Sequence, residues 1–269
     1  MREIKMRNKS GISLGVADGV GGWVESGVDP SVFSQALMYH AHRYSKLAWV
    51  GEPEIDPTQE YEEREEVEGW ELKPEECLEL ALGGVLRERQ VVAGSSTACI
   101  VNLNASSGVL RAAKSMPFRE LTFVSLRQLA KIPTSPFSRY EDAESDSPKD
   151  ADLYETRLRD GDIVILYTDG LSDNVFMSEL AAICSFVSRQ FTVSPPSMNL
   201  IAPLPPISEP EGEDDSSSPP AVEDVEVQAM ADRIVHYAQK CMFNKQRQSP
   251  FERAAAREGL FYRGGKPDE

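Results

Sequence analysis

The stretch GVADGVGGW, residues 15–23, places one carboxylate, Asp18, among four glycines and directly after a short apolar run. Residues 12–17 alternate weakly between apolar and small residues, which predicts a strand that runs into a turn carrying Asp18. A second run, GDIVILYT at residues 161–168, leads into Asp169-Gly170. It holds five consecutive apolar residues and is the strongest predicted strand in the sequence. Two apolar runs of the sequence therefore each end at an Asp-Gly pair.

The rest of the chain alternates between helical and extended patterns. Asp29-Pro30 is typical of a helix start, and apolar residues then recur every three or four positions as far as Tyr44. Similar spacing predicts helices over residues 74–89, 178–190 and 225–242, with Leu80, Val227 and Val235 among the apolar positions. Small and β-branched residues at 94–103 predict a buried strand, which a Ser-Ser-Gly turn joins to a return strand from Val109. No local period persists over residues 114–133.

Charge and composition exclude several classes of function. The 269 residues carry a net charge of −16, which argues against binding to nucleic acid or to an anionic membrane surface. Acidic residues concentrate at 52–76 and 209–226. We therefore expect one domain over residues 1–269 with an acidic loop at 51–76 and a disordered insertion, rich in proline, serine and acid, at 194–224. No apolar run approaches the ~18 residues of a membrane span, and the four cysteines lie too far apart in sequence for a zinc site or a disulfide framework.

Three aspartates share one local design, because Asp18, Asp169 and Asp268 each sit beside glycine or proline. Carboxylate and carbonyl oxygens are the ligands that Mg²⁺ and Mn²⁺ prefer, and glycine lets backbone approach an ion closely. Asp18 could bridge two metal ions, with the carbonyl of Gly19 as a further ligand, and two such ions can activate a shared water. An Asp-Gly pair after a strand is also a common turn, so the residues alone leave a purely structural role open.

These segments resemble the metal-dependent type 2C (PPM) serine/threonine protein phosphatases, and within them the branch of mitochondrial phosphatase 2C homologues. The resemblance rests on matches in family order: GVADGVGGW at 15–23, ESGVDPSVFSQALM at 25–38, GSSTACIV at 94–101, GDIVILYTDGLSDN at 161–174 and SPFERAAAREGLFYRGGKPDE at 249–269. It implies an α+β fold, a four-layer αββα sandwich of two mostly antiparallel sheets flanked by helices.

The resemblance also implies a site with two Mn²⁺ or Mg²⁺ ions. Asp18 matches the bridging ligand, Gly19 the residue that offers its carbonyl, Asp169 the ligand of the Asp-Gly motif, Asp268 that of the C-terminal motif, and Asp173 a secondary acid near a weaker metal position. The implied reaction is in-line attack of metal-activated water on phosphoserine or phosphothreonine of a protein substrate. Asp18 and Asp169 are the residues expected to be catalytic. A monomer is expected, and the branch implies a mitochondrial location, although MREIKMRNKSG at the start shows no targeting segment; otherwise we expect a cytoplasmic protein.

The sequence departs from the family pattern in ways that define an alternative. The family's Gly-Asp-Ser/Ala-Gly motif does not follow Ala113, the ten residues before Gly11 leave little room for an upstream strand, and no closing strand follows Asp268. We therefore expect the sandwich to lack some strands. The alternative function is that of a noncatalytic pseudophosphatase, or a shortened isoform, that binds phosphoproteins without turnover.

Overall fold

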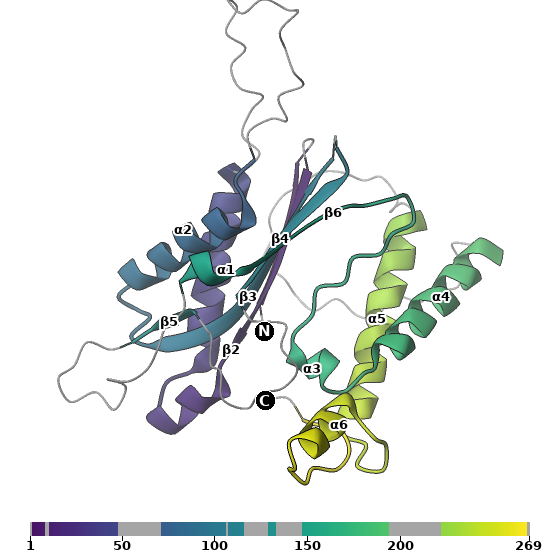
Figure 1. Ribbon diagram of the computed structural model, residues 1–269. Coiled ribbons are helices and arrows are strands. Elements are labelled where there is room, and N and C mark those ends of the chain that lie inside the picture. Colours follow the sequence, from purple (N-terminus) through teal and green to yellow (C-terminus); the bar gives the residue numbers. More distant parts are fainter. Residues whose placement is uncertain are drawn as a thin grey trace, which may run out of the picture. The chain divides into compact units, whose positions relative to one another are not determined.

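A computed structural model describes residues 2–8, 11–47, 71–105, 107–115, 129–132, 147–193 and 222–267. The chain divides into two compact units, one comprising residues 1–168 and the other beginning at Asp169. Unit 1 contains an antiparallel sheet with two long helices, and unit 2 is helical among its described residues (Figure 1). The predicted combination of helices with an antiparallel sheet is confirmed. The described residues form one sheet, of six strands, where the family pattern predicts two.

The sheet of unit 1 is built around the stretch that precedes Asp18. Strand β2 (Gly11–Gly19) lies between β1 (Arg2–Asn8) and β3 (Gly94–Asn104), and the order continues through β4 (Val109–Ser115) to β6 (Asp152–Arg157). The short β5 (Leu129–Lys131) pairs with the start of β3. The predicted strand at 12–17 and the predicted hairpin of β3 and β4 are confirmed. Residues 2–8 also form a strand, contrary to the expectation that the ten residues before Gly11 leave little room for one.

Two helices cover one face of this sheet and create its core (Figure 1). Helix α1 (Pro30–Leu47) begins where predicted, because an Oδ1 of Asp29 accepts a hydrogen bond from the backbone N–H of Ser31 at 2.9 Å. Helix α2 (Pro74–Arg87) packs beside it. The buried side chains between helices and sheet are apolar and include Phe33, Leu37, Ala41, Leu78, Ala81, Val85, Ala98, Ile100 and Ala113.

The predicted strand at 161–168 is wrong for the described structure. These residues have no regular secondary structure, and the side chains of Ile163 and Val164 are 49% and 39% exposed. A strand requires hydrogen-bonding neighbours as well as an apolar sequence, and no strand among the described residues pairs with this segment. The apolar run therefore favours an extended strand, but none of the described strands lies beside it to form the hydrogen bonds of a sheet.

The described residues of unit 2 form four helices and the segment that follows them. These are α3 (Asp169–Ser172), α4 (Met177–Val193), α5 (Val222–Met242) and α6 (Pro250–Arg257), and α4 packs against α5 (Figure 1). The guanidinium of Arg247 joins them: it donates to both carboxylate oxygens of Glu179, at 3.0 and 2.8 Å, and to the hydroxyl of Tyr237 at 3.2 Å. Glu179 in turn accepts from the backbone N–H of Phe176 and so caps the start of α4.

Two predicted insertions lie mostly outside the described residues. Of the acidic loop at 51–76, only residues from Glu71 onward are described, and from Pro74 they belong to α2. Of the insertion at 194–224, only residues 222–224 are described, and they are helical, so its predicted end is too late. Asp224 falls in the first turn of α5, where the helix dipole favours negative charge.

Some predicted helix faces also differ from the structure. Leu80, Val227 and Val235 are exposed, whereas Leu78, Leu82, Met230 and Cys241 are buried in their place. The four cysteines are free thiols, which agrees with the expected lack of a disulfide framework. In the described part of the chain, no helix is both long and apolar enough to cross a membrane.

Candidate metal and phosphate site

Asp18 is the penultimate residue of β2 and is half-buried, so it lies in the sheet where the sequence predicted the following turn. It pairs in register with Thr97, and its carbonyl accepts a hydrogen bond from the hydroxyl of Ser96 at 2.8 Å. Beyond it, the indole N–H of Trp23 donates to the hydroxyl of Ser95 at 2.7 Å. Trp23 itself is buried. The two serines of β3 thus hold the chain at Asp18 and, after the Asp18-Gly19 pair, at Trp23.

Gly19 is required here by close packing. A Cβ atom at this position would collide with the backbone carbonyl of Pro30, the first residue of α1. The end of β2 and the start of α1 can therefore approach each other only with glycine at 19. This contact connects the Asp18 position to the helix layer of unit 1.

In unit 2, Asp169 opens helix α3 and Asp173 follows its last residue. The backbone N–H of Asp173 donates to the carbonyl of Asp169 at 2.8 Å, which sets the two carboxylates one helical turn apart. Asp169 was predicted in a turn at a strand end, and it lies instead at the start of a helix. The side chain of Asp169 is 49% exposed and that of Asp173 is 15% exposed.

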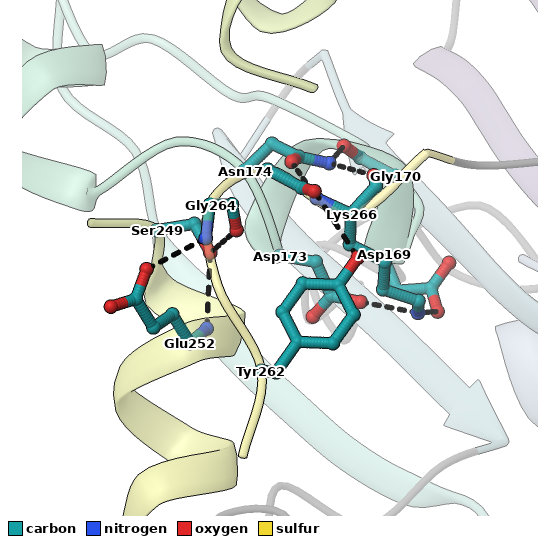
Figure 2. A network of polar contacts seen from close by, with 10 residues as sticks. Asp169, Gly170, Asp173, Asn174, Ser249, Glu252, Tyr262, Gly264 and Lys266 are labelled. Atoms are coloured by element: carbon teal, nitrogen blue, oxygen red, sulfur yellow. Dashed lines mark hydrogen bonds and ion pairs between the residues drawn. The ribbon is translucent and has the colours of Figure 1, made fainter. Parts of the chain in front are cut away.

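The ammonium group of Lys266 contacts both carboxylates (Figure 2). Its Nζ lies 3.2 Å from Oδ2 of Asp169 and 2.6 Å from Oδ2 of Asp173. Partial burial by itself lowers the pKa of Lys266, but the hydrogen bonds and negative charges of Asp173 and Asp169 outweigh burial and raise that pKa. Lys266 is therefore a fixed cation, and its ion pairs persist until the pH rises above the lysine's ordinary pKa of 10.5.

Asn174 connects the two chain segments that meet at this point (Figure 2). Its side chain is fully buried, and its amide donates to the carbonyls of Gly170, at 2.9 Å, and Lys266, at 2.8 Å. Its Oδ1 accepts from the backbone N–H of Lys266 at 2.8 Å. The Asn174 side chain therefore binds both the N–H and the carbonyl of Lys266, and so holds the backbone of the segment that leads to Asp268.

The C-terminal segment is held further by the end of α5 and by α6 (Figure 2). The hydroxyl of Ser249, the residue preceding α6, donates to the carbonyl of Gly264 at 2.6 Å, and Glu252 accepts from the N–H of Gly264 at 2.8 Å. A Cβ at Gly265 would collide with the carbonyls of Cys241 and Met242. The two glycines before Lys266 thus allow the chain to lie directly on the end of α5.

The predicted site residues fall into three groups. Asp169 and Asp173 come together in unit 2, whereas Asp18 and Gly19 belong to unit 1. Asp268 lies outside the described residues. Within the described part of the chain, no three histidine, cysteine or acidic side chains converge as a complete metal site would require. Lys266 and Asn174 are the functional residues that sequence reasoning missed.

The residues present nevertheless fit a divalent cation. Two carboxylate oxygens point at one position, and a positive charge, the Lys266 ammonium, already stands between them. Hard oxygen donors of this kind suit Mg²⁺ and Mn²⁺. Asp169 and Asp173 therefore offer two carboxylate donors to a cation, and its remaining donors would come from elsewhere in the chain.

Comparison with known proteins identifies relatives that are protein phosphatases. No family model matches the chain. The chain is 29% identical to "Protein phosphatase PTC7 homolog fig" of Drosophila grimshawi, over 96% of its own length and 72% of that protein. It is 28% identical to the human "Protein phosphatase PTC7 homolog", over 98% of its length and 74% of that protein. The solved structure of the photosystem II phosphatase PBCP shares the fold, with a TM-score of 0.61, 19% identity, and coverage of 98% of this chain and 86% of that one.

The chain resembles the type 2C protein phosphatases, and PTC7 homologues are similar to it over nearly its whole length. By this resemblance it is a protein phosphatase, an enzyme that acts on phosphoproteins.

Proposed function

We propose that the chain is a metal-dependent serine/threonine phosphatase that hydrolyses phosphoserine and phosphothreonine in proteins. The convergence of Asp169 and Asp173 on one cation position, in a chain that resembles the type 2C phosphatases, carries this proposal. Two Mn²⁺ or Mg²⁺ ions are the proposed cofactors. Asp18, the carbonyl of Gly19 and Asp268 are the proposed additional ligands, by resemblance to the family.

Each described residue then has a distinct task. Asp169 and Asp173 would hold a divalent cation, which when bound supplies a Lewis acid that lowers the pKa of water and offsets the charge of a phosphoryl group. Asn174 holds the carbonyl of Gly170 and the backbone of Lys266 in one arrangement. Such positioning matters because a reaction at phosphorus depends on the alignment of the attacking and leaving groups.

Phosphate release from a phosphothreonine peptide tests the proposal. We expect hydrolysis by the purified chain in Mn²⁺, loss of hydrolysis with chelator, and about 100-fold less activity in Asp169→Asn, because loss of a group that supports a metal costs up to this factor. Asp162→Asn is the matched control, since Asp162 is exposed and its side chain accepts one hydrogen bond from the backbone N–H of Arg159. Folded protein without metal-dependent hydrolysis would support the noncatalytic phosphoprotein-binding alternative.

Two further proposals follow from the resemblance to the branch. We propose a mitochondrial location, which fluorescence microscopy of the tagged full-length protein tests. We also propose a monomer, which sedimentation equilibrium tests.

A further inference from the structure

Lys266 is held in place by more than its two ion pairs. Its backbone N–H and carbonyl are both bound by the buried amide of Asn174. Its Nζ also lies 4.9 Å from the centre of the Phe251 ring, within the range of a cation–π contact. A lysine on the surface usually samples many rotamers. Here the backbone clamp, the ring and the carboxylates of Asp169 and Asp173 select one of them.

The electrostatics of the pair explain why a cation is favourable at this position. Two carboxylates one helical turn apart repel each other, and Asp173, the more buried one, gains most from a neighbouring positive charge. Lys266 supplies that charge from within the chain. A divalent cation that binds the same Oδ2 atoms of the two carboxylates must take the place of the ammonium, because two cations at contact distance from the same oxygen atoms repel each other strongly.

We infer that Lys266 is an internal counter-ion that competes with the divalent cation for Asp169 and Asp173, and that it leaves these carboxylates when the metal binds. This inference rests on the proposed metal-dependent function and deepens it, because it adds a positioning residue that sets metal affinity. By thermodynamic linkage, whatever favours the Lys266 contacts weakens metal binding by the same factor. The lysine thus keeps the carboxylates in place at low metal concentration and raises the concentration needed to load the site.

Calorimetric titration with Mn²⁺ of the full chain tests the competition. We expect Lys266→Met to bind Mn²⁺ about 3–10-fold more tightly than the wild type, the factor that corresponds to breaking two partly exposed ion pairs. Lys240→Met is the matched control, because it removes the same charge from unit 2 at an exposed position near the end of α5. Equal changes in both variants would reflect net charge alone and overturn the inference.

The outcomes separate this inference from the proposed function. Metal binding that is unchanged or weaker in Lys266→Met overturns the counter-ion role and leaves the metal-dependent phosphatase in place. Binding in none of the proteins overturns both. Weaker binding could follow from a disturbed fold, so circular dichroism and thermal unfolding of the variant accompany the titration.

A measurement on the wild-type chain avoids the variant altogether. Acetylation by an amine-reactive reagent, followed by peptide mass spectrometry, reports how exposed each lysine ammonium is. We expect saturating Mn²⁺ to increase the acetylation rate of Lys266 severalfold and to leave that of Lys240 unchanged. An unchanged or reduced rate at Lys266 under conditions where calorimetry shows binding would contradict displacement.

Discussion

The two Asp-Gly pairs, Asp18-Gly19 and Asp169-Gly170, look alike in sequence, and the structure holds them by different means. The first ends a strand with hydrogen-bonded neighbours on both sides and packs against the start of α1. The second opens a four-residue helix, where the buried amide of Asn174 binds the carbonyl of Gly170 and the ammonium of Lys266 pairs with Asp169. A carboxylate can therefore be positioned by a sheet, in which many residues contribute hydrogen bonds. It can also be positioned by a clamp, here the hydrogen bonds of the Asn174 side chain to Gly170 and Lys266.

The clamp is the more vulnerable of the two. We predict that Asn174→Ala lowers the free energy of unfolding of unit 2 by about 3 kcal/mol, since it removes three hydrogen bonds worth about 1 kcal/mol each and leaves part-buried backbone groups without these partners. Chemical denaturation measures the loss. Asn244→Ala is the control, because that side chain is exposed and accepts one hydrogen bond, from Gln246. If both variants were equally stable, Asn174 would not hold the second pair.

The sheet-bound pair has its own weak point at Gly19. We predict that Gly19→Ala lowers the free energy of unfolding of unit 1 by about 2 kcal/mol, because the new methyl group overpacks the contact with Pro30. Gly22→Ala, in the same glycine-rich stretch, should be neutral or slightly stabilising, because a methyl group there meets no atom within 4 Å. Thermal unfolding of the two variants compares them. Equal melting temperatures would show that β2 and α1 do not approach as closely as described.

The same contrast explains how much of the fold could be predicted. In unit 1, the spacing of apolar residues predicted α1, α2, β2, β3 and β4. It could do so because helices cover the sheet, and the side chains buried between them recur at the period of each helix or strand. β6, with the sequence DLYETR, gave no such signal, since its side chains are mostly exposed. Residues 161–168 gave a false signal, since an apolar run cannot report whether a partner strand is present.

The site could be predicted only in part, for a related reason. Asp169 and Asp173 stand in a local motif that the sequence displays directly. The contact of Asn174 with Lys266 joins residues 92 positions apart, and no local pattern records such a contact. The one available signal was the Gly264-Gly265 pair before Lys266, which indicated close backbone approach without naming the partner.

We propose, by resemblance to the type 2C phosphatases, that both Asp-Gly pairs serve the same reaction, although they are held so differently. Phosphate release from a phosphothreonine peptide in Mn²⁺, measured side by side for Asp18→Asn, Asp169→Asn and the wild type, is the experiment that decides this. We expect each variant to stay folded and to lose about 100-fold or more of the activity. Wild-type activity in Asp18→Asn would contradict it, because the first pair would then be a turn of the sheet and no part of the site.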